Sequence, residues 1–434
     1  MEKGVNNNSK KFLKKNKSTN SVNARVKDSQ QPKLPLIFSI GMFLAPIAWY
    51  GPAGSVRNTL VPQLFSNIDS AHKVWAVGII SAVATIAGAI ANIVFGALSD
   101  VTHSSWGRRK PYILGGAIFV ALSFFVIANL KSIIAIILIW IIAASAENAM
   151  AAAMYPEISD RIAPKWRGTV STFYGVGFTI AQQAFIVLAA QFLGNIKLGF
   201  YVMGAITLVI GIAHIFLVKE KSNLDRPKVA ITKKTFTKYF FFPTKGARDF
   251  YLALIGKFFM VVGTMMINTY QVYLFTDYLG LSKAGASGSI STYSTIMLVV
   301  GLIFCAISGP IADKFKRVKT IVVIGSFILG FAALFPLFAV QRWAMFVYAF
   351  IAAIGNGIYN SVDNALNIDV LPSSDTAGKD MGLLNLANTL SQALAALVGS
   401  ALVAAAGGYR AIFVASLIFE LIAAGFIFAI RAVK

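Results

Sequence analysis

The sequence has little of what soluble enzymes depend on. Charged residues make up only 13% of the 434 residues, roughly half the share in an ordinary soluble chain. There are three histidines and one cysteine, Cys305, so no intramolecular disulfide can form and no thiolate cluster can hold a metal. We find no nucleophile paired with a base, no metal-ligand spacing and no phosphate-binding loop. The sequence therefore argues against an enzyme and predicts no cofactor and no metal site.

Apolar stretches dominate what is present. Hydrophobic residues make up 57% of the chain, and long apolar runs recur from Leu36 to the C-terminus. A helix needs about 20 residues to cross about 30 Å of hydrocarbon. We therefore predict an all-α membrane protein with twelve transmembrane helices in two six-helix pseudo-symmetric bundles. The expected spans are residues 36–61, 74–99, 111–130, 132–157, 168–192, 199–218, 249–278, 284–312, 320–341, 343–367, 381–406 and 410–432.

The formal net charge of +22 comes from 39 Lys and Arg residues against 17 Asp and Glu. An excess of this size can indicate a nucleic-acid partner, but its distribution here follows membrane topology, so we predict none. If both termini are cytosolic, the inner segments hold 31 of the basic residues and the six outer loops hold one each. The positive-inside rule then predicts that both termini lie in the cytosol.

Two polar segments organise the chain. Residues 1–33 are rich in Asn, Lys and Ser and have no apolar stretch, so we expect a disordered basic cytosolic tail rather than a signal peptide. Residues 219–248 form the longest internal polar stretch. They predict a basic cytosolic loop between an N-terminal bundle at 34–218 and a C-terminal bundle at 249–434.

The two halves echo each other in sequence. Gly96-Ala-Leu-Ser-Asp100 closes the second expected span, and Gly309-Pro-Ile-Ala-Asp313 closes the eighth. A basic cluster follows each of them. Two parallel repeats of six spans, joined by a basic loop, are the layout of a transporter whose binding site lies between its halves.

The segment GALSDVTHSSWGRRKPY, from Gly96 to Tyr112, is the most specific pattern in the chain. Gly96 allows neighbouring helices to approach closely, and Asp100 can accept bonds from a guanidinium or a helix N-terminus. We expect the arginines to pair with carboxylates after the fourth span, in contacts that exist only while the cytosolic side is closed. The expected gating residues are Gly96, Asp100, Gly107, Arg108, Arg109, Glu157, Asp160, Asp313 and Asp369.

This segment resembles the signature of the major facilitator superfamily. Its longer form is similar to the branch that contains plant sucrose/proton symporters and their bacterial and animal relatives, and more distantly to the glycoside–pentoside–hexuronide carriers. The stretches Arg57-Asn-Thr-Leu-Val-Pro62-Gln and Asp369 to Asn388 resemble bacterial members of that branch. The resemblance covers residues 36–432. It implies proton-coupled symport of a disaccharide or related glycoside, such as maltose or sucrose, by alternating access.

Three positions depart from the family pattern. The general superfamily motif has an Arg directly after its Asp, where this chain has Val101. Plant members carry a titratable Asp in the fourth helix, and the nearest acid here is Glu147. The second helix lacks the paired carboxylates that form the sodium site of glycoside carriers. This last difference favours protons as the coupling ion.

An ionisable group inside a span is costly unless it is paired or hydrated, so each one is a functional candidate. Glu147 in the fourth span and Asp363 in the tenth are the expected proton-coupling residues. We expect His214 at the membrane interface, and we expect Lys257 to snorkel toward the cytosol. Arg57 either snorkels to the headgroups or pairs with a substrate hydroxyl or an acidic residue.

A sugar site needs amide and carboxylate partners for hydroxyl groups and an aromatic face for the C–H surface of the ring. Polar side chains inside the spans supply these groups, although the same amides can also join one helix to another. The expected substrate-binding residues are Arg57, Asn58, Gln182, Gln183, Asn268, Tyr270, Gln271, Asn356, Tyr359, Asn360, Asn385 and Asn388.

Two other functions stay open. A proton-driven exporter of drugs or amphipathic compounds is expected to have a more apolar cavity than these amides indicate. A transporter-like receptor or scaffold is expected to show an eroded gating motif or a large extra domain, and the sequence has neither. The partners we expect are a small-molecule sugar, protons and the lipid bilayer, for a monomer in a bacterial plasma membrane.

Overall fold

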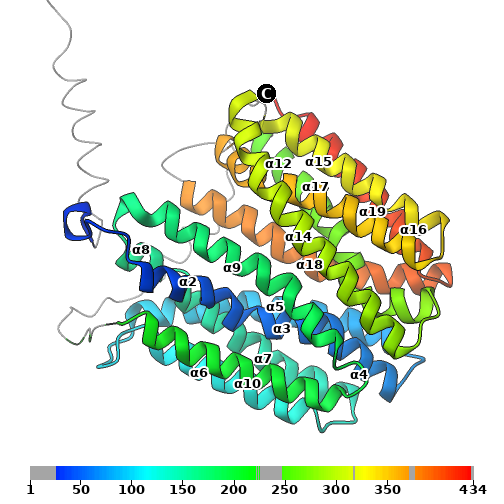
Figure 1. Ribbon diagram of the computed structural model, residues 1–434, viewed down its shortest axis with the longest axis horizontal. Coiled ribbons are helices and arrows are strands. Elements are labelled where there is room, and N and C mark those ends of the chain that lie inside the picture. Colours follow the sequence, from blue (N-terminus) through cyan, green and yellow to red (C-terminus); the bar gives the residue numbers. More distant parts are fainter. Residues whose placement is uncertain are drawn as a thin grey trace, which may run out of the picture.

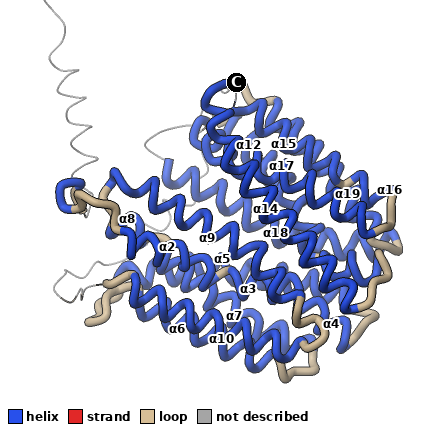
Figure 2. Tube along the Cα trace, in the orientation of Figure 1, coloured by secondary structure: helices blue, strands red, loops and turns tan. Residues whose placement is uncertain are grey.

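The computed structural model describes residues 26–220, 222, 224, 247–315, 318–370 and 377–431, and all regular structure in these residues is helical (Figure 1 and Figure 2). The helices, in chain order, are η1 (Asp28–Gln30), α2 (Leu36–Trp49), α3 (Gly51–Ser55), η2 (Val56–Leu60), α4 (Val61–Ile68), α5 (Lys73–Val101), α6 (Lys110–Ile127), α7 (Ile133–Met154), α8 (Glu157–Arg161), α9 (Pro164–Ala190), α10 (Ile196–Leu217), α12 (Arg248–Thr269), α13 (Gln271–Tyr273), η3 (Leu274–Tyr278), α14 (Lys283–Phe315), α15 (Val318–Ala332), α16 (Leu334–Phe338), α17 (Arg342–Asp369), α18 (Ala377–Ala406) and α19 (Arg410–Phe428).

The described helices confirm the prediction of an all-α protein with twelve spans. Eleven helical segments are long and apolar enough to cross a membrane. The twelfth, α17, has 28 residues and packs against α14 and α15. The boundaries differ from expectation most clearly in the first span, which continues to Ile68 rather than ending near residue 61.

The first span is a broken helix. The π-helical turn η2 separates α3 from α4, and Pro52 and Pro62 stand at the starts of those two helices. Proline has no N–H to donate, so it is tolerated at these positions. The seventh span breaks in the same way, since α12 ends at Thr269 and η3 is again π-helical. Breaks of this kind re-aim side chains and are frequent at functional sites of transporters.

Each half of the chain packs as its own bundle. In the first bundle α7 lies against α5 and α6, and α2 lies against α9 and α10. In the second, α17 lies against α14 and α15, and α12 lies against α18 and α19. The two bundles meet where α5 packs on α18 and where α9 packs on α14.

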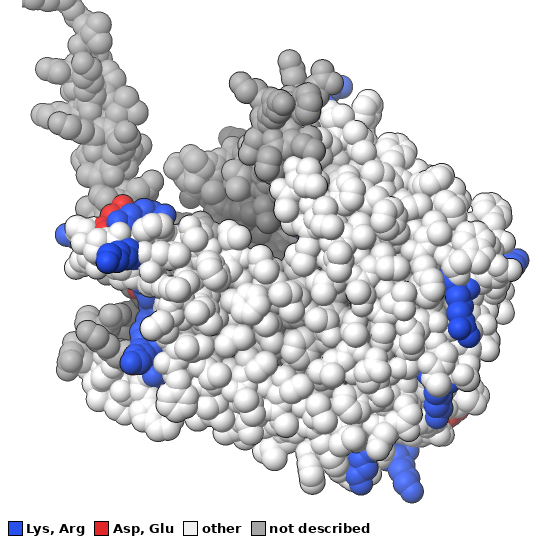
Figure 3. All heavy atoms as spheres, in the orientation of Figure 1, with Lys and Arg blue, Asp and Glu red and all other residues white. Residues whose placement is uncertain are grey.

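Charged side chains gather at the two ends of the helices. We call the end formed by residues 100–110, 157–167 and 219–220 the basic end, and the end formed by residues 69–73, 191–195, 279–283 and 406–410 the far end. On the face in Figure 3, a wide uncharged surface separates the two groups of Lys and Arg. Large apolar side chains such as Phe216 and Ile134 are exposed, at 73% and 70%. An apolar belt between two polar rims fits a bilayer.

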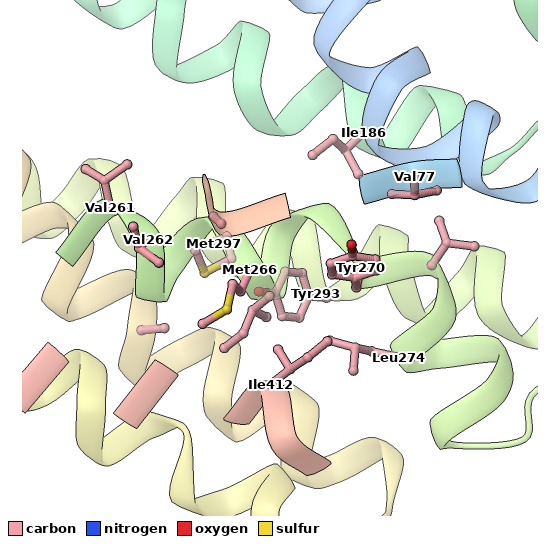
Figure 4. Close-up of a cluster of buried hydrophobic side chains, with 14 of the residues drawn as sticks. Val77, Ile186, Val261, Val262, Met266, Tyr270, Leu274, Tyr293, Met297 and Ile412 are labelled. Atoms are coloured by element: carbon pink, nitrogen blue, oxygen red, sulfur yellow. The ribbon is translucent and has the colours of Figure 1, made fainter. Parts of the chain in front are cut away.

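An apolar seam joins the bundles toward the far end. Val77 of α5 and Ile186 of α9 lie in the same buried cluster as Tyr270 and Leu274 of the second bundle, as Figure 4 shows. All four side chains are buried. This packing holds the far halves of the two bundles against each other.

The segment before the first span docks onto the first bundle. The side-chain amide of Gln31 donates to the Arg161 carbonyl at 3.0 Å. The indole N–H of Trp166 donates to the Gln31 carbonyl, also at 3.0 Å. The expectation of a disordered tail is therefore wrong for residues 28–31, because these contacts fix them. Residues 1–25 lie outside the described residues.

Glycine at position 177 sets the distance between α2 and α9. A Cβ atom there would lie 2.1 Å from the Phe43 carbonyl oxygen, whereas one on Gly175 would meet nothing within 4 Å. We expect Gly177→Val to force the helices apart and to destabilise the protein by about 1–3 kcal/mol, measured by thermal unfolding in detergent. Gly175→Ala is the matched control and is expected to leave the unfolding temperature unchanged or raise it. Equal unfolding temperatures for the two variants would contradict this assignment.

Candidate functional site

An aromatic wall lies inside the first bundle. Trp49 and Tyr50 stand at the break between α2 and α3, and their ring centroids are 5.4 Å apart. Phe178 of α9 lies 4.9 Å from Tyr50, and Tyr174 accepts a hydrogen bond from the Trp49 indole at 3.2 Å. Tyr174, Phe178 and Gln182 follow one another at four-residue spacing, so they share one face of α9. This face combines half-buried rings with an amide.

Glu147 of α7 is a buried acid in the same bundle. Its residue is only 3% exposed, and it makes no hydrogen bond to any other described residue. The positive charge that acts on its carboxyl group is that of Arg57. Arg57 is half-buried on η2, with its guanidinium 6.0 Å from the centroid of the Tyr50 ring. The sequence predicts that Arg57 either snorkels to the headgroups or pairs with a substrate hydroxyl or an acidic residue. Its position beside the Tyr50 ring favours the second possibility.

Half-buried amides lie on several helices of both bundles. None of them hydrogen-bonds to another described residue, although amides withdrawn from water normally do so. They are therefore available to water or to a ligand. They are Asn58 of η2, Gln182 and Gln183 of α9, Asn268 of α12, Asn356 of α17 and Asn388 of α18.

Three other predicted substrate-binding residues are fully buried. The Tyr270 hydroxyl donates to the Ala396 carbonyl at 2.6 Å, and its ring lies in the apolar seam, so here it serves packing. Gln271 is 1% exposed, and its Nε2 has no hydrogen-bond partner in the part of the chain that the structure describes. Tyr359 lies beside Asp363. Asn360 and Asn385 lie outside the residues whose side chains are described.

An ion pair occupies the interior of the second bundle. Lys257 Nζ of α12 lies 2.7 Å from Asp363 Oδ2 of α17, and Asn367 donates to the same oxygen at 2.9 Å. The Lys257 side chain is only 14% exposed. The expectation that Lys257 snorkels is therefore wrong, because a buried carboxylate one helix away offers it a closer partner than the headgroups.

The predicted gating motif forms a charge cluster at the basic end. Arg109 donates to Asp100 at 2.6 Å and to Asp160 of α8 at 3.2 Å, and Arg108 also pairs with Asp160. All four residues belong to the first bundle. These contacts all lie within the first bundle, and the expectation that they exist only while the cytosolic side is closed stays a prediction. They tie the ends of α5, α6 and α8 into one unit.

The two glycines of the motif have different roles. Gly107 adopts a φ of 96°, and a Cβ there would lie 2.3 Å from the Glu220 side chain. Glu220 accepts the backbone N–H of Arg109 at 3.0 Å, so it caps the start of α6. At Gly96 the nearest atom to a Cβ would be 3.8 Å away, on Ala152, so close helix approach does not require glycine there.

Glu157 does not join the arginine cluster. Its Oε2 lies 2.8 Å from Nε2 of His214, which is 0% exposed. The expectation of an arginine from the motif as the partner of Glu157 is therefore wrong, because His214 of α10 occupies its Oε2. His214 lies in the last turn of α10, and its expected position at the membrane interface stays a prediction. Asp313 and Asp369, the other expected gating residues, lie outside the residues whose side chains are described.

Among the residues whose side chains are described, polar contacts between the two bundles lie at the far end, and a second-bundle contact of Tyr409 supports them. Lys73 of α5 pairs with Asp277 of η3 at 2.6 Å, and its ammonium lies 4.9 Å from the Tyr273 ring centroid. The Tyr273 hydroxyl donates to the Pro62 carbonyl at 2.9 Å. Tyr409 donates to Asp277 at 2.8 Å. Burial and the neighbouring carboxylate raise the pKa of Tyr409, so this hydroxyl keeps its proton. We call Pro62, Lys73, Tyr273, Asp277 and Tyr409 the far-end closure.

Sequence reasoning missed the far-end closure and two buried pairs. Lys257 and Asp363 are ions of opposite sign inside spans, and that signal could have suggested the pair. Nothing in the sequence joins Lys73 to Asp277, since they lie in different halves. Nothing in it joins Glu157 to His214 either.

Comparison with known proteins identifies the fold. A family model described as Major Facilitator Superfamily matches residues 38–341 and 253–434. A bacterial homologue of the human lysosomal transporter Spinster, in an inward-facing and unoccupied conformation, aligns at 16% identity with a TM-score of 0.64, covering 91% of this chain and 94% of that chain. A variant of the nucleoside transporter NupG aligns at 15% identity with a TM-score of 0.66, covering 92% and 99%. No curated protein matches this chain.

The Lys73–Asp277 pair is the strongest charge contact of the far-end closure. We expect Lys73→Gln to weaken the closure by about 1 kcal/mol, a roughly fivefold population shift toward an arrangement open at the far end. The measurement is the rate at which an impermeant thiol reagent labels Ile186→Cys, a seam residue, in a Cys305→Ser background. Lys131→Gln, which changes another basic residue at the far end, is the control. The assignment is wrong if Lys73→Gln and Lys131→Gln label at the same rate.

Proposed function

This chain belongs to the major facilitator superfamily, and on that premise we propose that it is a proton-coupled importer of a disaccharide or related glycoside. It is a membrane transporter and not an enzyme. The proposal concerns its cargo, its coupling ion and its direction.

The observation that carries the sugar assignment is the set of half-buried amides without partners. A disaccharide presents many hydroxyl groups, each of which can donate and accept, and amides match both roles. Asn58 and Gln182 of the first bundle and Asn268 and Asn356 of the second supply such groups. The rings of Trp49 and Tyr50 offer the apolar face that a pyranose C–H surface needs. An amphipathic drug would leave these amides unpaired, which disfavours the exporter.

Two acids of the spans support proton coupling. Glu147 is buried without a hydrogen bond to any described residue, under the influence of Arg57. Asp363 is held as an ion by Lys257. We assign the transported proton first to Glu147, because an unpaired buried carboxyl group can gain or lose a proton without breaking an ion pair. Asp363 then serves as the fixed charge of the second bundle.

The end at which the two bundles are in contact indicates the side of the membrane to which the transporter opens. The excess of Lys and Arg places the basic end in the cytosol by the positive-inside rule. With the far-end closure formed, the arrangement is then inward-facing. In the cycle we propose, sugar and proton enter while the far end is open, and the far-end closure forms behind them. Release to the cytosol follows, and the arginine cluster moves as one rigid part of the first bundle.

The decisive experiment is uptake into proteoliposomes. The labelled panel contains maltose, sucrose and, because one similar structure is a nucleoside transporter, a nucleoside. We expect saturable accumulation of a disaccharide under an inward proton gradient, and its loss on addition of an uncoupler. Movement of a lipophilic dye without uptake of any sugar would replace this proposal with the exporter. Accumulation of the nucleoside alone would change the cargo.

Glu147→Gln isolates the coupling step. The amide keeps the shape of the side chain but carries no exchangeable charge, so we expect gradient-driven accumulation to fall at least tenfold while exchange of sugar across the membrane persists. Glu420→Gln makes the same chemical change at a carboxyl group that is 1% exposed and bonds to Thr264 in the other bundle, and we expect it to retain accumulation. Unchanged accumulation in Glu147→Gln refutes the assigned role.

A further inference from the structure

Three helices of the first bundle are joined by one histidine. His214 of α10 places Nδ1 2.9 Å from the Gly41 carbonyl oxygen of α2 and Nε2 2.8 Å from Glu157 Oε2 of α8. His214 is 0% exposed and Glu157 is 1% exposed. Nothing in the transport cycle described above uses these residues.

The partners of His214 fix how many protons this site holds. A carbonyl oxygen can only accept, so Nδ1 carries a hydrogen. Nε2 faces a carboxyl oxygen, and with no proton between them two lone pairs would oppose each other at 2.8 Å. One proton therefore lies between His214 and Glu157. Whether it is closer to the nitrogen or to the oxygen, the pair as a whole has no net charge.

A second partner for Glu157 lies one turn away. Oε1 of Glu157 and Nη1 of Arg161 are both buried, and neither has a hydrogen-bond partner among the described residues. The two residues are four apart on α8, the spacing at which side chains meet on a helix. The Arg161 guanidinium instead lies 5.9 Å from the centroid of the Phe38 ring on α2. Glu157 thus has two alternative partners.

The other charges around the pair are basic on balance. The segment Leu36–Trp49 of α2 carries no ionisable side chain. At the basic end, the ionisable groups on the elements that pack here are Asp160 and Arg161 of α8, Arg108 and Arg109 before α6, Lys110 and Tyr112 of α6, Tyr155 after α7, Lys165 and Arg167 of α9, and Lys219 and Glu220 after α10. Farther from this end, the same elements carry Glu147, Tyr174, Lys197 and Tyr201. Asp160 is engaged by Arg108 and Arg109. A carboxylate released from His214 therefore has Arg161 within reach, four residues along α8, as a cation whose Nη1 has no hydrogen-bond partner among the described residues.

We propose that Glu157 and His214 form a proton-binding site that switches Glu157 between two partners. With the proton bound, the site ties α2 to α8 and α10. When the proton leaves to solvent at the basic end, His214 stays neutral and keeps its bond to Gly41, and Glu157 pairs as a carboxylate with Arg161. Because α2 ends at Trp49 of the aromatic wall, the pH of the compartment at the basic end then regulates gating. This regulation is independent of the cargo and of Glu147.

The test reads the protonation of His214 directly. The chain has three histidines, so His72→Gln with His103→Gln leaves a single ring to observe by ¹⁵N NMR in nanodiscs. We expect Nδ1 to stay protonated across the titration and the Nε2 signal to change in one step. In the same step, hydrogen exchange in the Leu36–Trp49 segment is expected to rise.

Arg161→Gln is the discriminating variant. It removes the partner of the deprotonated form only, so the step should move to higher pH, by about one unit or more. Lys165→Gln, which removes a neighbouring cation that lies over Trp166, should leave the midpoint in place. Glu157→Gln should abolish the step, and if that variant does not fold, Arg161→Gln still decides. A His214 signal without a pH step, or a midpoint that Arg161→Gln does not move, overturns the proposal.

Discussion

The core of a bilayer offers no bulk water to polar groups, and the arrangement of this protein follows from where each polar side chain finds a partner. Lys257 and Asp363 neutralise each other between α12 and α17. Nε2 of His214 lies 2.8 Å from a carboxyl oxygen of Glu157, between α10 and α8. The half-buried amides Asn58, Gln182, Gln183, Asn268, Asn356 and Asn388 reach no partner within the described residues. Because they are also partly exposed, they are the polar groups that we assign to cargo and water.

Ion pairs within one bundle and ion pairs between the two bundles have different roles. The arginine cluster of Arg108, Arg109 and Asp160 lies inside the first bundle, so it can persist while the bundles rock. The Lys73–Asp277 pair crosses between bundles, so it exists only while the far end is closed. An intrabundle ion pair is a structural support, and an interbundle ion pair belongs to one conformational state. Gating is therefore better sought at the far end than in the motif at the basic end.

Some site features could be predicted from sequence because they depend on the cost of burying one residue. Glu147 and Arg57 stand out as ionisable residues within apolar spans, and the structure buries Glu147 and half-buries Arg57 in the first bundle. The other site features depend on contacts between residues of different helices. Tyr270 looked like a ligand-binding side chain, but its hydroxyl donates a hydrogen bond to the Ala396 carbonyl of α18. Glu157 lies only three residues before Asp160, yet Glu157 contacts His214 of α10 and Asp160 contacts Arg108 and Arg109.

The sequence by itself determined that the chain is an all-α membrane protein of twelve spans, since span length, apolar composition and loop charge are local properties that the bilayer imposes. It also determined which polar side chains had to be accounted for inside those spans. Only the tertiary structure decided which of them satisfy one another and which stay open, and at which end the two bundles meet. Those outcomes depend on how helices from distant parts of the chain are rotated and packed, and hydropathy along one helix does not record the side chains of its neighbours.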